Sequence, residues 1–182
     1  DKELVKRVAE LASQVGTDEI VTVVGHLKEQ IQEVLGDSVK YAYQDELLGT
    51  GHAVMQASKF LEGKSGKVVI LYGDVPIIRK ETIENLIIKS FKNKEYATLL
   101  TAIYENPTGY GRIIRDEGGN IKAIVEEKDA NIFEKEIKEI NSGIYCFDIE
   151  ELLSALKLLK PNNAQGEYYL TDVIKIMNDK GL

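Results

Sequence analysis

The segment LYGDVP, residues 71–76, carries the strongest chemical signal in the sequence. An apolar run ends in a small residue, Gly73, followed by an acid, Asp74, and then by a proline that stops the strand. In an open parallel sheet, ligands bind just beyond the carboxyl ends of the strands. A carboxylate there can hold Mg²⁺, which favours one or two carboxylates together with substrate phosphates. Asp74 therefore either binds a ligand or caps a turn, since aspartate is also a leading turn residue.

A second candidate is LLGTGHA, residues 47–53, in which Gly49 and Gly51 flank Thr50 directly before a helical pattern. Backbone N–H groups at a helix start can approach a nucleotide closely where side chains are absent. No GK[ST] follows, so the segment is not a Walker loop. The alternative is that Thr50 is only a helix N-cap. Gln44 precedes the segment at the end of a strand, where its amide either pairs with a base edge or is exposed.

Two glycine-rich or charged segments follow later in the chain. NPTGYGRI, residues 106–113, predicts a tight loop between strands. Gly111 serves backbone geometry in that loop unless its N–H faces a ligand. The charge run at residues 125–129 is typical of a solvated face, so that only one of its residues, such as Glu126, need have a special role.

Two polar positions complete the candidates. Asn141 lies inside the strand-like run EINSGIYCF, where it either faces a cavity or makes an ordinary structural hydrogen bond. In NNAQGEYYLTD, residues 162–172, Thr171 could cap the last helix. The chain holds only two histidines, His26 and His52, which excludes a histidine-rich metal site, and no GxSxG elbow is present.

The spacing of apolar residues alternates between a helical and a strand-like pattern, and these elements must position the candidate residues. Strand-like and helical runs alternate over the first hundred residues, and shorter strands joined by turns follow before two final helices. Such alternation predicts an α/β fold with a mostly parallel sheet flanked by helices. The strands are expected at residues 20–24, 38–43, 67–72, 97–102, 111–115, 120–126 and 139–148. The helices are expected within residues 1–16, at 26–35, at 50–61, from 80 or 81 to 91, and near 150–159 and 169–179. No linker or repeat interrupts them, so residues 1–182 are taken as one domain.

Composition narrows the class of protein. The 182 residues carry a net charge of -7, which argues against a nucleic-acid partner because phosphate neutralisation needs surplus Lys and Arg. No apolar run is long enough to span a membrane. The single cysteine, Cys146, excludes an intrachain disulfide and fits a reducing compartment such as the cytoplasm.

Six ordered motifs resemble one family. LLGTGHA, LYGDVP, NPTGYGRI, IVEEKDA, EINSGIY and NNAQGEYYLTD, in this order and spacing, resemble the uridylyltransferase domain of the bifunctional bacterial N-acetylglucosamine-1-phosphate uridylyltransferase/glucosamine-1-phosphate acetyltransferase. The resemblance implies a Rossmann-like fold and a cytoplasmic enzyme of cell-wall precursor synthesis. It implies a reaction in which UTP and N-acetylglucosamine 1-phosphate give UDP-N-acetylglucosamine and pyrophosphate with Mg²⁺. Another nucleotide or sugar 1-phosphate, or a non-catalytic sugar-nucleotide-binding role, stays open as an alternative.

The resemblance also assigns roles to residues. Gln44, Gly49 and Thr50 correspond to uracil-side contacts. Tyr72, Gly73 and Asp74 correspond to the nucleotide and metal segment, with Asp74 as the catalytic Mg²⁺ ligand. Gly111, Glu126 and Asn141 correspond to contacts with the amino sugar.

Two features of the family have no counterpart in this sequence. No glycine-rich phosphate loop with its Arg and Lys occurs, and the first strand that carries it is missing. The β-helix acetyltransferase domain, through which the family forms homotrimers, is also missing, as is a second metal ligand, an Asn. We therefore expect the sequence to be part of a longer protein, inactive by itself, or its gap to be filled by a strand from a neighbouring copy.

Overall fold

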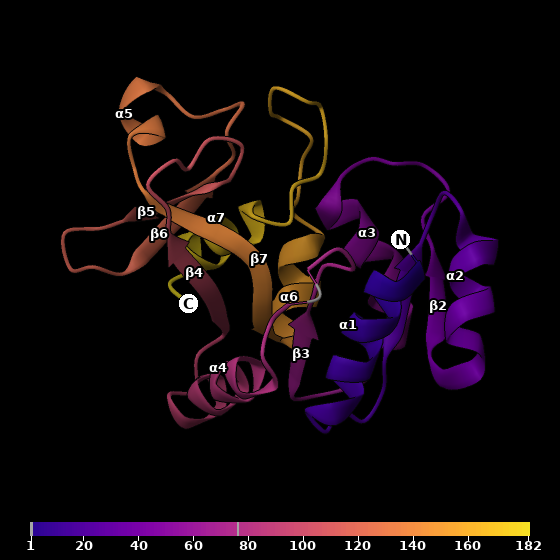
Figure 1. The fold of residues 1–182 in the computed structure, drawn as a ribbon. Helices are drawn as coiled ribbons and strands as arrows, with labels where there is room; N and C mark the ends of the chain where they lie inside the picture. Colours follow the sequence, from indigo (N-terminus) through magenta and orange to yellow (C-terminus); the bar gives the residue numbers. More distant parts are fainter. Residues whose placement is uncertain (1, 76) are drawn as a thin grey trace.

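The computed structural model describes residues 2–75 and 77–182, with the side chain of Lys2 left aside, and divides their strands between two sheets (Figure 1). The smaller sheet pairs β1 (Val21–Val24) with β2 (Lys40–Tyr43) in parallel. Both strands are β-branched or aromatic at alternate positions, which suits a pleated and half-buried surface.

The larger sheet is built around its longest strand, β7 (Glu139–Asp148). Its neighbours β3 (Lys67–Ile70) and β4 (Ala97–Ile103) lie on either side of it, and both run antiparallel to it. The sheet continues through β5 (Arg112–Arg115), which pairs with the Ile140 end of β7, to β6 (Ile121–Val125). As a result, the polar start of β7 lies beside the loops that flank β5 and β6.

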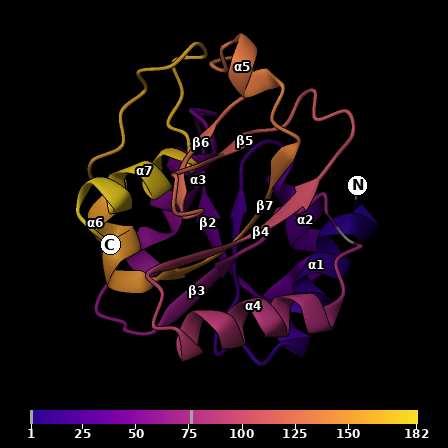
Figure 2. The same cartoon turned by 90° about the vertical axis from the view of Figure 1, so that its left-hand side faces the viewer.

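Helices cover both faces of the larger sheet (Figure 2). Alternate residues of β7 point to opposite faces. Tyr145 and Phe147 join the core packed by α6 and α7, and Ile144 and Cys146 join the core packed by α1 and α4. The helices are α1 (Lys2–Gln14), α2 (Lys28–Leu35), α3 (Thr50–Ala57), α4 (Lys80–Lys92), α5 (Ile132–Lys135), α6 (Ile149–Leu156) and α7 (Asp172–Asp179), with single 3₁₀ turns η1 (Gly36–Ser38) and η2 (Ser58–Phe60). In the described part of the chain, none of these helices has the length and apolarity that a membrane crossing requires.

The predicted α/β class is confirmed, but the prediction of a mostly parallel sheet is wrong. Within residues 2–75 and 77–182, β1–β2 is the one parallel pair, and the remaining pairings are antiparallel. The crossover through α4 does leave β3 and β4 running in the same direction, as helix-linked strands do. However, β7 lies between them, and its direction is not encoded in the periodicity of either strand.

The two sheets share no strand in the described structure. β3 pairs only with β7, and β1 pairs only with β2, so each has one edge without a strand beside it. The described chain exposes 10,759 Å², whereas a folded monomer of 20.3 kDa typically exposes about 8,800 Å². The excess agrees with the two open strand edges.

Candidate active site

The centre of the candidate site is the ring of Tyr72, which follows β3 and lies across the backbone of β7. A Cβ atom added to Gly143 would come within 2.5 Å of Tyr72 Cε2, so a glycine is needed for the ring to lie there. Gly143 also has a φ of 78°, a conformation that favours glycine. Sequence reasoning selected Tyr72 but missed Gly143, because a glycine inside a strand gives no indication of what approaches it.

Gly111, Glu126 and Asn141 lie together, as the resemblance implied. The Asn141 N–H donates to the Gly111 carbonyl at 2.9 Å, and this bond joins the start of β7 to the loop before β5. A Cβ on Gly111 would lie 3.2 Å from Glu126 Oε2, so the glycine leaves room for that carboxylate. Three segments that are separate in sequence therefore present an amide and a carboxylate at one place.

The Glu126 carboxyl is half-buried and lies near other acidic residues. Burial raises its pKa, although the hydroxyl of Thr171, donating to Oε1 at 3.0 Å, works in the opposite direction. Thr171 does occupy the N-cap position of α7 as predicted, but its side chain makes no capping bond. The hydroxyl holds Glu126 instead, a role that the capping pattern concealed.

Tyrosine hydroxyls connect this group to the centre of the site. Asn141 Nδ2 donates to the Tyr145 hydroxyl at 2.6 Å, and the Gly143 N–H donates to Asn141 Oδ1 at 3.1 Å. Burial raises the pKa of Tyr72, the negative charge of Glu126 raises it further, and the hydroxyls of Thr50 and Tyr145 act in the opposite sense. Tyr72 thus lies between Thr50 on one side and the Glu126 group on the other.

A pocket of about 280 Å³ opens beside Thr50 at the start of α3. Gln44 lies at its wall and is nearly buried, with Nε2 donating to the Gly49 carbonyl at 3.0 Å. The pocket is lined by Gln44, Leu47, Gly49, Thr50, Ala53 and Glu167. We call it the base pocket. It holds all three residues that the resemblance assigns to the uracil side.

The glycines of the base pocket are required by close packing. A Cβ on Gly49 would lie 2.7 Å from the Tyr168 carbonyl oxygen, and the N–H of Gly51 donates to that same oxygen at 2.8 Å. Gly49, rather than Thr50, is the N-cap of α3, and no side chain caps the helix. The Thr50 hydroxyl instead accepts a bond from the Leu170 N–H at 3.1 Å. The NNAQGEYYLTD segment therefore supports the base pocket from behind.

Gly73 and Asp74 lie at the exposed rim beyond β3. A Cβ on Gly73 would meet only Val5, at 3.9 Å, so this glycine is not required by packing and leaves the approach open. The Asp74 charge is close enough to contribute to the raised pKa of Tyr72. The proposed capping of a turn before Pro76 lies outside the described residues.

Asp74 is the candidate Mg²⁺ ligand at this rim. No group of three or more His, Cys, Asp or Glu residues that could hold a metal occurs among the residues that the structure describes. Mg²⁺ typically keeps several waters and binds through one or two carboxylates plus substrate phosphates. A single exposed carboxylate such as Asp74 can bind Mg²⁺ together with substrate phosphates and waters. The described residues do not form a site that would hold the ion through protein ligands alone.

An ion pair that sequence reasoning missed connects the loop before β5 to the turn after β6. The Arg112 side chain is 1% exposed, and its Nη2 lies 2.6 Å from Glu127 Oε2. The same guanidinium donates to the Tyr110 carbonyl, and the Gly109 N–H donates to Glu127 Oε2 at 3.2 Å. The hydrogen bond from Arg112 is the main cause that lowers the pKa of Glu127. Two adjacent glutamates thus have pKa values shifted in opposite directions.

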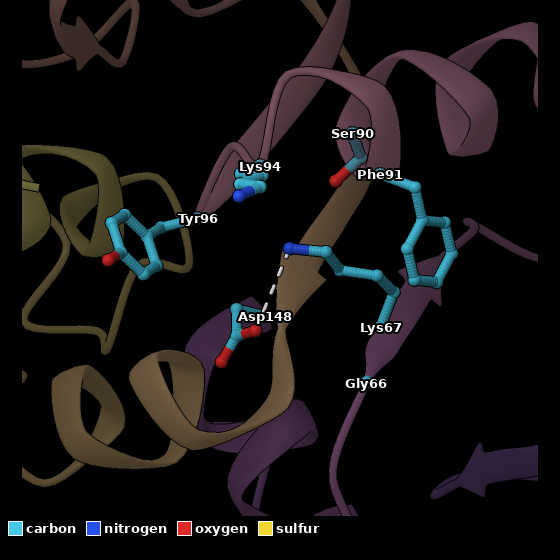
Figure 3. Close-up of a pocket in the computed structure, with 7 residues that line it drawn as sticks. All are labelled: Gly66, Lys67, Ser90, Phe91, Lys94, Tyr96 and Asp148. Carbon is cyan, nitrogen blue, oxygen red and sulfur yellow. Dashed lines mark ion pairs between the residues drawn. The ribbon is translucent and has the colours of Figure 1, made fainter.

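A larger pocket, of about 320 Å³, lies at the opposite end of β3 and holds none of the predicted residues (Figure 3). Its main polar contact is an ion pair of 3.6 Å between Lys67 and Asp148. Lys67 also donates to the Glu95 carbonyl at 2.6 Å, and Asp148 caps α6 through the N–H of Glu150. These contacts stabilise the fold, so size alone does not identify the functional pocket.

Comparison with known proteins identifies the family. The family model described as nucleotidyl transferase matches residues 1–182. The chain belongs to the nucleotidyl transferase family. Among curated proteins, it is 52% identical over 178 residues to the bifunctional protein GlmU of Acetivibrio thermocellus, covering 98% of this chain and 39% of that protein. It is 53% identical over 180 residues to GlmU of Caldanaerobacter subterraneus, covering 99% of this chain and 39% of that protein. The chain thus spans about two fifths of the length of these relatives.

Solved structures of other nucleotidyl transferases share the fold. A Bacillus anthracis structure assigned as a glucose-1-phosphate thymidylyltransferase superposes with a TM-score of 0.76 at 21% identity, covering 98% of this chain and 71% of that one. A UDP-glucose pyrophosphorylase bound to UDP-glucose superposes with a TM-score of 0.68 at 17% identity, covering 97% and 75%. At such low identity, the likeness shows the fold alone.

The opposite pKa shifts of Glu126 and Glu127 predict opposite pH dependences of stability. Glu126 has a raised pKa in the folded state, so its contribution is largest below pH 4.5 and is lost as pH rises through the folded pKa. Glu127 has a lowered pKa, so its contribution is present above pH 4.5 and is lost as pH falls. As pH rises from 4.5 through the folded pKa of Glu126, the free energy of unfolding of the wild type relative to Glu126→Gln should fall. As pH rises toward 4.5 from the folded pKa of Glu127, the free energy of unfolding relative to Glu127→Gln should rise. Urea unfolding of the intact protein at several pH values measures both slopes, and slopes of equal sign would contradict the assignment.

Proposed function

We propose that the chain transfers the uridylyl group of UTP to N-acetylglucosamine 1-phosphate, giving UDP-N-acetylglucosamine and pyrophosphate. The observation that carries this proposal is the continuous line of polar groups from the base pocket through Tyr72 to Glu126 and Asn141. The polar groups at its two ends suit a nucleotide at one end and an amido sugar at the other. Half-identity to two proteins named bifunctional GlmU supports the same assignment.

Each part of the line has a chemical task in this proposal. In the base pocket, Gln44, Gly49 and Thr50 bind the uracil side of the nucleotide. At the other end, Gly111, Glu126 and Asn141 bind the acetamido and hydroxyl groups of the sugar. A phosphate oxygen of the sugar phosphate then attacks the α-phosphorus of UTP in line, the bond from that phosphorus to the β-phosphate oxygen breaks, and pyrophosphate leaves. Such transfers depend on positioning and on stabilisation of charge.

Asp74 is the residue that we propose to hold Mg²⁺, together with Tyr72 and Gly73 as the nucleotide segment. The ion, when bound, would neutralise charge on the phosphates. The exposed place of Asp74 and the open approach over Gly73 support this role, because substrate phosphates and waters must supply the other ligands.

The two other functions that remain open use the same residues differently. Solved structures of this fold are named for thymidylyl transfer and for UDP-glucose, so the fold itself accommodates other nucleotides and sugars. A protein that only senses sugar nucleotides would bind UDP-N-acetylglucosamine without metal dependence.

Substitution of Glu126 separates the sugar end from the nucleotide end. Glu126→Ala should raise the KM for N-acetylglucosamine 1-phosphate about tenfold or more, because a hydrogen bond to a charged group contributes about 1.5–3 kcal/mol. The KM for UTP should change by about twofold at most. Steady-state kinetics of the intact protein with each substrate varied in turn gives both values. The exposed Glu117→Ala is the matched control and should change neither KM. Equal effects on both substrates would count against the assignment.

Substitution of Asp74 tests the metal segment. Asp74→Asn should lower kcat about a hundredfold, as does the loss of a single charge-stabilising group in other transfer enzymes. It should also shift the Mg²⁺ dependence of the rate to higher concentration, because a neutral amide binds this ion more weakly. The measurement is the rate of product formation over a Mg²⁺ titration, with the exposed Asp37→Asn as control. An unchanged Mg²⁺ dependence would show that Asp74 is not a ligand.

We also propose that a further strand, with its phosphate loop, belongs between β1 and β3. The open edges of both strands and the excess exposed area support its place. The intact protein would then be a cytoplasmic homotrimer joined through an acetyltransferase domain, with residues 1–182 as part of its uridylyltransferase domain.

The proposed strand predicts a difference between the isolated chain and the intact protein. Residues 1–182 alone should form UDP-N-acetylglucosamine at a rate below about one hundredth of that of the intact protein, because the loop donors that stabilise phosphate charge are missing. Chromatographic detection of the UDP-sugar measures both rates. A rate for the isolated chain equal to that of the intact protein would refute this prediction.

A further inference from the structure

His52 on the first turn of α3 lies behind the base pocket, between two glutamine side chains. Its Nδ1 lies 3.1 Å from Gln44 Nε2, and its Nε2 lies 3.0 Å from Gln56 Nε2. The ring faces Tyr168 at a centroid distance of 6.2 Å. Nothing in the proposed reaction uses this histidine.

The Gly49 carbonyl, which can only accept a hydrogen bond, determines which atoms donate and which accept around His52. Gln44 Nε2 donates to the Gly49 carbonyl at 3.0 Å, which places the amide nitrogen, and not the oxygen, on that side. The second N–H of the same amide is then directed at His52 Nδ1, which must be the unprotonated ring nitrogen. Gln56 Nε2 also lies 3.4 Å from the His52 carbonyl, a longer contact than the 3.0 Å from Gln44 Nε2 to the Gly49 carbonyl. Because a neutral imidazole has one acceptor nitrogen, only one of the two amides can donate to the ring, and we assign that role to Gln44 on its shorter carbonyl contact. The ring proton is then on Nε2 and is donated to Gln56, whose amide turns to present its oxygen and gives up the 3.4 Å contact.

The assignment leaves the Gln44 amide oxygen for the base pocket. Among the residues that the structure describes, no donor lies within hydrogen-bond distance of Oε1, and this oxygen is not among the buried polar atoms without a partner. The oxygen is therefore not fully buried, and Gln44 lines the base pocket. An amide oxygen accepts from the N3–H of uracil, whereas N3 of cytosine carries a lone pair and would be repelled.

We propose that His52 is a positioning residue that fixes the orientation of the Gln44 amide, and thereby selects a pyrimidine with a proton on N3. The inference rests on the proposed function, in which the base pocket binds uracil. Without the acceptor at Nδ1, the amide keeps its bond to the Gly49 carbonyl but loses the second of the two bonds that hold its nitrogen on that side, so the turned orientation becomes more populated. A turned amide presents N–H groups to the base, which repel N3–H of uracil and can donate to N3 of cytosine.

Two substitutions separate the acceptor from the bulk of the ring. His52→Phe keeps a ring against Tyr168 but removes the acceptor, and we expect it to lower the preference for UTP over CTP, measured as the ratio of kcat/KM values, about tenfold. His52→Asn places Oδ1 close to the position of Nδ1, so this variant should keep the preference within about twofold. Both are measured in the intact protein with N-acetylglucosamine 1-phosphate. His52→Leu is a second variant without an acceptor should the phenylalanine variant fail to fold.

A double-substitution cycle shows whether His52 acts through Gln44. In a Gln44→Ala background, His52→Phe should change the UTP to CTP ratio no further. The exposed His26→Asn, at the other histidine, should leave the ratio unchanged. Equal losses for UTP and CTP in His52→Phe would indicate a structural role only and overturn the inference.

The outcomes for the wild type separate this inference from the proposed function. An intact wild-type protein that shows no preference for UTP, in turnover or in equilibrium binding with Mg²⁺, would overturn the proposed function. A wild type that prefers UTP, together with a His52→Phe variant that keeps the preference, would overturn only the role of His52.

Discussion

The close approach of the Tyr72 ring to the backbone of β7 at Gly143 is the contact on which the site depends. It is possible only because position 143 has no Cβ, since the nearest ring atom would lie 2.5 Å from one. The antiparallel pairing of β3 with β7 brings the two segments to the same end of the sheet. The contact joins the base pocket beside Thr50 to the group formed by Glu126 and Asn141, which otherwise belong to separate parts of the chain.

The adjacent carboxyls of Glu126 and Glu127 have different surroundings, and their pKa values are shifted in opposite directions. Burial raises the pKa of Glu126 above its ordinary value, although the hydrogen bond from the Thr171 hydroxyl lowers it in part. Glu127 faces the buried guanidinium of Arg112 and the N–H of Gly109, so its pKa is lowered and it fixes the loop before β5. Glu126 directly follows β6 and Glu127 lies in the turn after it, so the two side chains have different neighbours.

The polar groups behind the base pocket show how a fold can set the chemistry of a single amide. Gln44 makes contact with the Gly49 carbonyl and with His52, and both contacts are local in sequence. The backbone that positions them is held by the distant segment around Tyr168, which accepts the Gly51 N–H. Support from a remote segment explains why packing alone already requires glycine at positions 49 and 51.

The sequence by itself determined the α/β class, the positions of most strands and helices, and the set of segments that meet at the site. Hydrophobic periodicity reports which face of each element is buried, and the full span of β7 at residues 139–148 was predicted on that basis. It did not determine the direction of β7 between β3 and β4, since the same alternation suits a parallel or an antiparallel partner. Gly143, Arg112 and the bond of Thr171 to Glu126 also became visible only in three dimensions. Each depends on a neighbour that lies far away in the chain, and local patterns contain no information about such neighbours.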